Sequence, residues 1–202
     1  MSLIYRVEND NFRVSIYQDE QVDSPRDWDN LGTFFAYHRD YMIGDYTPMN
    51  TERYSSWYDW FENALGHEKF IALPVYCLDH GGLRVNTTGF GHADPGGWDS
   101  GQIGWIYVKR SYAQLEGMDE EQVKDVLRQE IETLDQWLAG DVYGFCIECR
   151  EVCPECLHVD YHLVDSCWGV FGSDVTKNGM LDYMLPTLVN ETDLIEQLKE
   201  GW

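Results

Sequence analysis

The sequence predicts an α+β fold: a single domain over residues 1–202 in which a mainly antiparallel sheet packs against one long amphipathic helix plus short helices. Three observations lead to this prediction. The chain contains one long helical stripe, short apolar runs lie before and after it, and neighbouring runs are joined by short turns. Short turns suit antiparallel strands, whereas a doubly wound α/β fold would need more helices between its strands. No repeat or low-complexity segment divides the chain.

The N-terminal part of the chain supplies one strand and two short helices. Residues 12–20, FRVSIYQDE, alternate apolar and polar side chains, which is typical of a strand. The segment from Ser24 to Pro48 is bounded by proline and contains two glycines, so we expect turns around a short helix. Ser55 to Leu65 places aromatic and aliphatic side chains at helical spacing and stops before Gly66, which predicts a short amphipathic helix.

The middle of the chain predicts three more strands. Residues 70–80 form a nearly continuous apolar run of the kind found in buried strands. Residues 83–90 alternate and are expected to pair with that run across the Gly81-Gly82 turn. Residues 92–102 form a glycine-rich loop, and residues 103–113 follow it as the third strand.

The long helix is expected over about Asp119 to Gly140. Asp119 and Gln122 have the spacing of a capping box, and Gly140 is a natural stop. One face carries the apolar residues of an amphipathic helix. These are Val123, Val126, Leu127, Ile131, Leu134, Trp137 and Leu138.

A hairpin and a final helix complete the predicted fold. Residues 141–148 and 162–172 are interpreted as its two strands, and residues 146–162 form a Cys-rich hairpin tip. A last short helix is expected over about Thr192 to Lys199, after the turn at Pro186.

The charge of the chain is its most unusual global property. There are 36 acidic against 14 basic residues, a formal net charge of -22, and only five of the basic residues are lysines. Direct binding of nucleic acid is disfavoured, because it needs basic side chains that neutralise phosphates. Two interpretations remain: a solvated surface that serves solubility, or a surface that competes with nucleic acid for the basic groove of another protein.

Candidate partner-binding residues follow from this charge. Glu121, Asp125 and Glu132 are expected on the exposed face of the long helix, and Trp57 and Tyr58 are candidate aromatic anchors, since exposed aromatic side chains are typical of protein interfaces. No apolar run reaches about 18 residues, and the N-terminus has no signal-peptide pattern. We therefore expect a soluble protein of the host cell cytosol.

Four cysteines lie close together in the segment CIECREVCPEC, with the spacing C-x2-C-x3-C-x2-C. They are Cys146, Cys149, Cys153 and Cys156. In a reducing cytosol such a cluster more often holds metal than disulfides, and thiolates are preferred zinc ligands, so the favoured hypothesis is one structural zinc ion. Three residues between the pairs make a tight loop, so His158 or His162 could replace one sulfur. Free thiols, a loop disulfide and an iron–sulfur cluster are the alternatives.

Cys167 raises the alternative of a small enzyme. A thiol nucleophile, with His80 as base and Gln102 as oxyanion donor, would supply the parts of a thiol active site. The more ordinary interpretation is that Cys167, beside Trp168 in a strand, is a small buried apolar residue. The enzyme is therefore the less favoured hypothesis.

Five short words of the sequence resemble a known family. They are SPRDWDNLGT at 24–33, DH-G at 79–81, WDSGQIGWIYV at 98–108, GDVYGF at 140–145 and DSCWGVFG at 165–172. Together they resemble an uncharacterised family of small acidic proteins associated with phages, plasmids and bacterial genomes that carry such elements. The resemblance implies a mobile-element setting, in which proteins that interfere with host defence are common. The cysteine cluster departs from the family pattern, where a shorter polar hairpin joins the last two words.

These observations favour one function and leave two alternatives. The favoured hypothesis is an acidic phage-type protein that binds and inhibits or modulates a nucleic-acid-binding host defence protein, by nucleic-acid mimicry. A small cysteine- or metal-dependent enzyme is the first alternative. The second is a structural or accessory protein whose acidity serves solubility alone.

Overall fold

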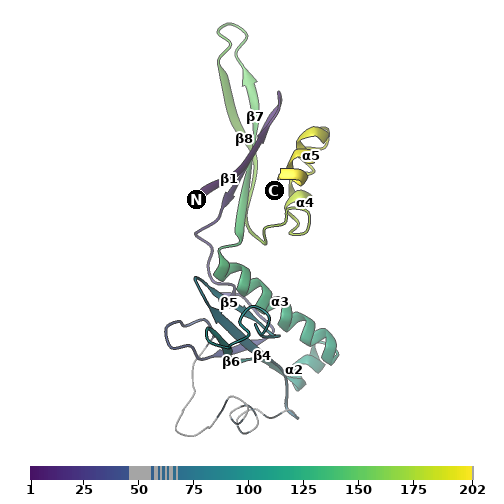
Figure 1. Cartoon of the computed structure of the whole chain (residues 1–202). Helices are drawn as coiled ribbons and strands as arrows, with labels where there is room; N and C mark the ends of the chain where they lie inside the picture. The colour runs from purple at the N-terminus through teal and green to yellow at the C-terminus, as the bar shows by residue number, and fades with distance from the viewer. Residues whose placement is uncertain are drawn as a thin grey trace. The chain divides into compact units, whose positions relative to one another are not determined.

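The computed structural model describes residues 1–45, 56, 59, 61, 63, 66 and 68–201. The chain forms two compact units, one made of Met1–Asp23 with Gly140–Trp202 and the other of Ser24–Ala139 (Figure 1). The predicted α+β class with antiparallel sheets is confirmed. The described strands make two four-stranded sheets, one in each unit, where the sequence analysis expected one sheet. That the whole chain behaves as a single domain stays a prediction.

The sheet of the first unit has the strand order β1-β2-β7-β8, with every neighbouring pair antiparallel. Its strands are β1 (Ser2–Glu8), β2 (Phe12–Gln18), β7 (Val142–Val152) and β8 (Val159–Phe171). Asn9 closes the β1–β2 turn, because its side-chain oxygen accepts hydrogen bonds from the backbone N–H groups of Asn11 and Phe12. The sequence analysis did not expect β1, and it ended the first hairpin strand at residue 148, whereas β7 continues to Val152.

Two helices complete the core of the first unit. They are α4 (Met180–Met184), which was not expected, and α5 (Thr192–Gly201), which confirms the predicted last helix. Leu194 and Leu198 of α5 are fully buried, as helical spacing of four predicts for one apolar face. The core also contains side chains from β2, β7 and α4. Examples are Val14, Ile16, Phe145, Ile147, Met180 and Met184.

The sheet of the second unit has the order β3-β6-β4-β5, again antiparallel throughout. Its elements are the 3-10 turn η1 (Pro25–Asp27) and the strands β3 (Thr33–Ala36), β4 (Phe70–Asp79), β5 (Leu83–Asn86) and β6 (Ser100–Lys109). The strands β4, β5 and β6 confirm that three strands lie in this part of the chain. The third was expected over residues 103–113, but β6 begins at Ser100 and residues 110–113 are helical. The segment 24–48 was expected to form turns around a short helix, but its residues 33–36 form β3.

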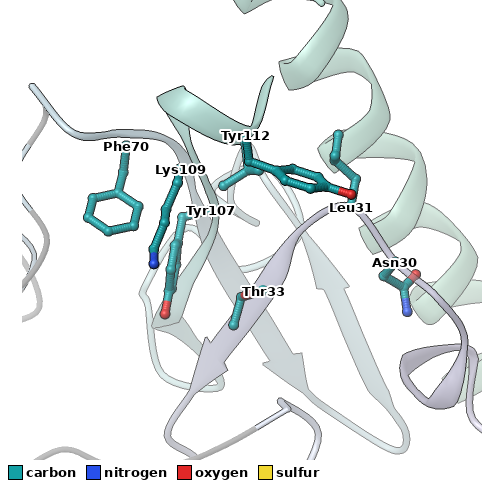
Figure 2. Close-up of a pocket in the computed structure, with 8 residues that line it drawn as sticks. Asn30, Leu31, Thr33, Phe70, Tyr107, Lys109 and Tyr112 are labelled. Atoms are coloured by element: carbon teal, nitrogen blue, oxygen red, sulfur yellow. The ribbon is translucent and has the colours of Figure 1, made fainter. Parts of the chain in front are cut away.

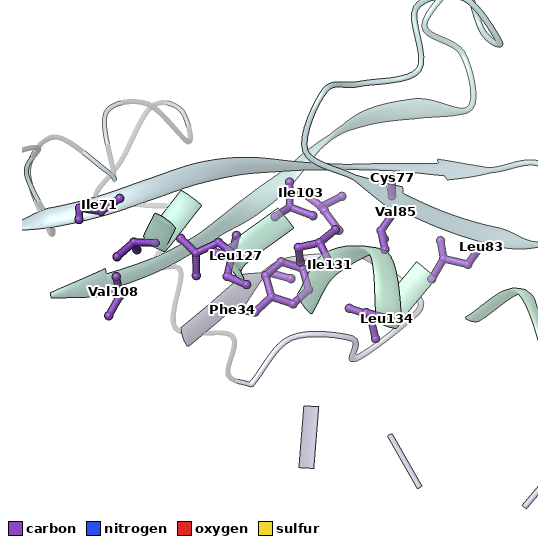
Figure 3. Packing of buried hydrophobic residues seen from close by; sticks show 14 of the residues in the cluster. Phe34, Ile71, Cys77, Leu83, Val85, Ile103, Val108, Leu127, Ile131 and Leu134 are labelled. Atoms are coloured by element: carbon purple, nitrogen blue, oxygen red, sulfur yellow. The ribbon is translucent and has the colours of Figure 1, made fainter. Parts of the chain in front are cut away.

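Two helices follow β6: α2 (Arg110–Leu115) and α3 (Glu120–Ala139). The predicted capping box of α3 is confirmed, because the backbone N–H of Gln122 donates to Asp119 Oδ1 and the backbone N–H of Asp119 donates to Gln122 Oε1, both at 2.9 Å. Gly140 follows α3 with a φ of 74° and ends it. Most of the predicted stripe packs on the sheet, and Figure 3 shows Leu127, Ile131 and Leu134 among strand side chains, whereas Val126 lies outside this core cluster.

The word SPRDWDNLGT folds around the buried guanidinium of Arg26. That side chain is only 6% exposed and donates two hydrogen bonds to Asp45, one to Glu130 of α3 at 3.0 Å, and one to the carbonyl of Gly32 at 2.7 Å. Glu130 in turn accepts from the backbone N–H groups of Leu31 and Gly32. Burial alone would lower the pKa of Arg26, but the two carboxylates outweigh it and raise the pKa. This ion cluster fastens the turn before β3 to the long helix.

Most of the helix predicted over Ser55 to Leu65 lies outside the described residues, and so do the candidate anchors Trp57 and Tyr58. Phe61 is described: it is fully buried and stacks on Trp105 of β6, with ring centroids 4.3 Å apart. Among the described residues, no helix combines the length and the apolar character that a membrane crossing requires.

Candidate functional site

The exposed face of α3 carries the three predicted acidic residues. Glu121, Asp125 and Glu132 follow each other by four and seven residues, so they lie along one side of the helix, and all three are exposed. Other acids of α3 serve the fold instead. Asp135, for example, accepts from the Arg84 side chain and from the backbone N–H of Val85 at 2.8 Å.

Two of these exposed acids have basic neighbours on the same helix. Glu121 lies 3.1 Å from Lys124, and Asp125 bonds Arg128 at 2.5 Å. Exposed pairs of this kind contribute little to stability, since solvent and salt screen them. Their carboxylates can therefore exchange these neighbours for the cations of a partner at small cost. Glu132 extends the same stripe by about two further turns.

An exposed tryptophan lies beside this acidic stripe. Trp28 is 49% exposed, and it lines a shallow pocket of about 150 Å³ with Val126, Gln129 and Thr133 of α3. Gln129 is four residues after Asp125 and three before Glu132, so it neighbours both on the helix surface. We call the surface formed by Trp28, Glu121, Asp125, Gln129 and Glu132 the acidic–aromatic face.

Sequence reasoning missed Trp28 and selected Trp57 and Tyr58 as anchors instead. A usable signal was present, because Trp28 stands between Asp27 and Asp29 in a segment rich in turn-forming residues. A large aromatic side chain between two carboxylates in a turn is a poor candidate for the core.

Acidity is shared by both units. The first unit contains 17 acidic and 5 basic residues, and the second contains 19 acidic and 9 basic residues, which gives net charges of -12 and -10. The negative field therefore belongs to two folded surfaces and not to one acidic tail.

A second polar site lies at one edge of the β3-β6-β4-β5 sheet. His80 follows β4, and its Nδ1 lies 2.8 Å from Oδ2 of Asp99, in the loop before β6. His38 Nε2 is 4.0 Å from Asp79 Oδ2 in the same pocket, which has a volume of about 220 Å³. Trp98, also on this loop, is 89% exposed. The words DH-G and WDSGQ therefore meet in space.

The loop before β6 is held by Asp94. Its Oδ2 accepts hydrogen bonds from the backbone N–H groups of Asp99 and Ser100 and from the Ser100 hydroxyl, each at 2.9 Å. The Asp99 amide is the largest of the effects that lower the pKa of Asp94. The loop is thus shaped by its own hydrogen bonds, and these fix Asp99 beside His80.

The residues of the enzyme hypothesis are distributed over both units. Cys167 belongs to β8 of the first unit, where it is half-buried against the core, whereas His80 and Gln102 belong to the second unit. Gln102 Nε2 donates to the carbonyl of Gly104 in its own strand at 3.2 Å. Cys77 lines the pocket that contains His38, Asp79 and Asp99, but burial and the neighbouring Asp79 raise the pKa of its thiol. A raised pKa disfavours the reactive thiolate. The thiol enzyme stays an untested alternative.

One pocket of the second unit is lined by aromatic side chains next to β3 and β6. Figure 2 shows Phe70, Tyr107 and Tyr112 around it, with Lys109 among them. Its volume is about 370 Å³. Asn30 also lines it, but the Asn30 amide is engaged by the carbonyls of Pro25 and Trp28. The hollow therefore offers an apolar surface with one cation, and no acid–base pair.

The four clustered cysteines are not brought together. Strands β2 and β7 keep a continuous register in which Cys149 lies opposite Phe12 and Cys146 lies opposite Ser15. Side chains alternate along a strand, so Cys146 and Cys149 point to opposite faces of the sheet. All six cysteines have free thiols, and within the described part of the chain no three His, Cys, Asp or Glu side chains form a group that could hold a metal ion. Zinc at these residues stays a prediction.

Cys153 differs from the other thiols in its surroundings. The backbone N–H of Cys156 and then that of Glu155 donate to its sulfur, and these hydrogen bonds lower the pKa of Cys153. Burial has the opposite effect at Cys146, whose pKa is raised. Hydrogen bonds to a charged sulfur favour the thiolate, so Cys153 is the more reactive of the two.

We expect iodoacetamide to modify Cys153 several-fold faster than Cys77 and Cys146 at pH 7 in the reduced, metal-free protein, because the thiolate is the reacting species. Peptide mass spectrometry over a time course measures the three rates. The same experiment in concentrated urea is the control, where the rates should become similar. Equal rates in the folded protein would contradict this assignment of reactivity.

The fold and these surfaces define an acidic α+β protein with a tryptophan-bearing acidic helix face and a cysteine-tipped hairpin. Comparison of the chain with protein-family models, with curated proteins and with solved structures found no match.

Proposed function

We propose that this chain is an acidic, phage-type interaction protein that binds a nucleic-acid-binding host defence protein in the host cytosol and inhibits or modulates it by nucleic-acid mimicry. The acidic–aromatic face is the observation that carries this proposal. It combines exposed carboxylates at helical spacing with an exposed tryptophan on the same side of the second unit.

The physical basis is electrostatic steering with one apolar anchor. A net charge of -22 attracts a basic groove over a distance and raises the association rate. Carboxylates at the rim of an interface act mainly on encounter, whereas a large aromatic side chain at its centre supplies contact energy. Glu121, Asp125 and Glu132 fit the first role and Trp28 fits the second.

Reversing the three acids should slow association strongly. In a Glu121→Lys, Asp125→Lys, Glu132→Lys variant we expect an association rate at least about tenfold lower at low salt, and a difference that shrinks as salt rises, because exposed charges are screened over about 8 Å at physiological ionic strength. The assay loads purified bacterial nucleic-acid-binding proteins with a short fluorescein-labelled DNA duplex and follows duplex displacement by stopped flow.

The matched control reverses three exposed acids of the other unit, Asp182, Glu196 and Glu200, which gives the same change in net charge. If net charge alone drives binding, both variants lose the same amount of rate, and the acidic–aromatic face is refuted as the site. Trp28→Ala should accelerate dissociation and leave the salt dependence intact. Displacement that is indifferent to salt and to both triple variants would leave the acidity as solvation alone.

A further inference from the structure

The hairpin of β7 and β8 carries two cysteines, Cys153 and Cys156, in the loop at its end. Strand β2 pairs with β7 only as far as Cys149, so the ribbon beyond it consists of β7 and β8 alone. Pairing of the two strands ends at Val152 and Val159, and the loop between them is Cys153 to His158. In Figure 1 this loop forms the far end of the hairpin.

Within this loop the segment Cys153-Pro154-Glu155-Cys156 forms a closed turn. The backbone N–H of Leu157 donates to the carbonyl of Cys153 at 2.9 Å, and the backbone N–H of Cys153 donates to the carbonyl of His158 at 2.8 Å. The Cys153 sulfur accepts hydrogen bonds from the backbone N–H groups of Cys156 and Glu155, and from the Cys156 thiol. The turn therefore holds the two sulfurs side by side at the end of the hairpin.

Two adjacent thiolates are half of a structural zinc site, which takes four ligands in a closed tetrahedral arrangement. Among the residues that the structure describes, no His, Cys, Asp or Glu side chains complete such a group. Cys146 and Cys149 point to opposite faces of the sheet. The imidazoles of His158 and His162 are paired with carboxylates, at 3.3 Å from Asp160 and 3.1 Å from Glu151.

We propose that Cys153 and Cys156 bind Zn²⁺ together with the same two cysteines of a second copy of this chain, so that one zinc ion joins two hairpin tips. Two identical pairs related by a two-fold axis complete a four-sulfur site and leave no open end for further growth. Each thiol releases its proton to solvent as zinc binds. This inference does not depend on the proposed function.

Leu157 supports a contact at the tip by an independent observation. It is the one described residue other than glycine with a positive φ, 58°, and its side chain is 74% exposed. A left-handed conformation is unfavourable for a residue with a Cβ, and glycine would avoid that cost. A large apolar side chain at this strained and exposed position would be covered in a tip-to-tip dimer, as would the exposed part of Val152.

Repulsion between two acidic chains limits how they can meet. With a net charge of -22 on each, broad contact between two copies is unfavourable. The loop from Cys153 to His158 contains a single acidic residue, Glu155. A junction between two such loops therefore brings few like charges into contact, and charges farther apart than about 8 Å are largely screened at physiological salt.

The test uses the full chain, reduced with a phosphine and stripped with EDTA, to which ZnCl₂ is added before gel filtration. We expect half a zinc ion per chain, measured by mass spectrometry of the metal, and a doubling of the 23.5 kDa mass, measured by light scattering. Renewed EDTA treatment should restore the monomer. Co²⁺ titration of the same protein should saturate at half an equivalent, with the absorption of tetrahedral thiolate coordination.

Cys153→Ser and Cys156→Ser should abolish both zinc retention and the dimer, while the matched variants Cys146→Ser and Cys149→Ser should keep both. Circular dichroism checks that each variant is folded. One zinc ion per monomer, with dependence on all four cysteines, would replace this proposal by a site within one chain. Absence of zinc retention, or a dimer that persists after EDTA or in Cys153→Ser, would also overturn it.

Discussion

Replacing Arg26 by alanine is expected to destabilise the second unit by about 3–5 kcal/mol, because it leaves the largely buried carboxylate of Glu130 and the partly exposed carboxylate of Asp45 without their cation. Arg26 is almost fully buried and satisfies both Asp45 and Glu130. Glu130 is only 11% exposed, and it also organises the backbone of Leu31 and Gly32. Removing the guanidinium therefore disturbs the attachment of the β3 turn to α3, beyond the loss of one ion pair.

The measurement is urea unfolding together with hydrogen exchange of the α3 amides, since exchange reports the second unit specifically. Arg39→Ala is the matched control. Its guanidinium is 81% exposed and bonds the neighbouring Asp40, so we expect no measurable loss of stability. Arg26→Lys keeps the charge but cannot form the forked hydrogen bonds, and it should lie between the two. Equal stability of the Arg26→Ala and Arg39→Ala variants would contradict a structural role for the ion cluster.

The elements that sequence analysis predicted best are those whose determinants are local. The capping box of α3 and the apolar spacing of Val123, Leu127 and Ile131 depend only on residues within a few turns of one another. The β4–β5 turn at Gly81-Gly82 was predictable for the same reason. Long, periodic and capped segments specify their own conformation.

The features that sequence analysis missed depend on distant partners. Strand β3 contains only four residues, and it exists because it pairs with β6, about seventy residues later in the chain. Nothing in its local pattern separates it from a turn. The division of the strands into two sheets is likewise set by which strands meet, because the first unit joins residues from both ends of the chain.

The candidate site shows the same limit. The exposure of Glu121, Asp125 and Glu132 could be predicted from helical spacing, because these residues lie on a different face of the helix from the buried apolar residues. Trp28 could be placed beside them only by the packing of η1 on α3. The C-x2-C spacing of Cys146 and Cys149 was interpreted as a pair that chelates one metal ion. Two cysteines at this spacing can meet when they lie in a turn, but in a strand the same spacing places their sulfurs on opposite faces of the sheet.

Several of the five sequence words described above contain a glycine at a position where close packing leaves no room for a side chain. A Cβ on Gly32, in SPRDWDNLGT, would collide with the Leu127 side chain of α3. A Cβ on Gly144, in GDVYGF, would overlap the ring of Trp168, in DSCWGVFG. These words thus describe contacts that hold the fold together, whereas the acidic–aromatic face lies mostly outside them. Of the acidic–aromatic face, these words contain Trp28, whereas the residues on α3 lie outside them.

A third glycine, Gly104, is packed against backbone atoms, and its replacement is expected to have the second large effect on stability. We expect Gly104→Ala to cost about 3 kcal/mol or more, because the added methyl group would overlap the backbone carbonyl oxygen of Phe35. Gly104 lies in β6 between β3 and β4, opposite Ala36 on one side and Val75 on the other. A backbone atom cannot rotate away as a side chain can, so relief requires β3 to separate from β6.

Gly101→Ala is the matched control in the same strand, where no atom lies within 4 Å of the added methyl group. This change should not lower the free energy of unfolding. It can raise that free energy by up to about 1 kcal/mol, because alanine loses less backbone entropy than glycine on folding. Thermal and urea unfolding of the two variants, with hydrogen exchange at the β3 amides, measure the difference. Separation of β3 would also release Phe34 and Phe35, two fully buried side chains of the second unit, so the Gly104 variant should lose exchange protection there first. If the two alanine variants were equally stable, β6 would have to tolerate a side chain at its most crowded position, and the close packing of β3 on β6 would be refuted.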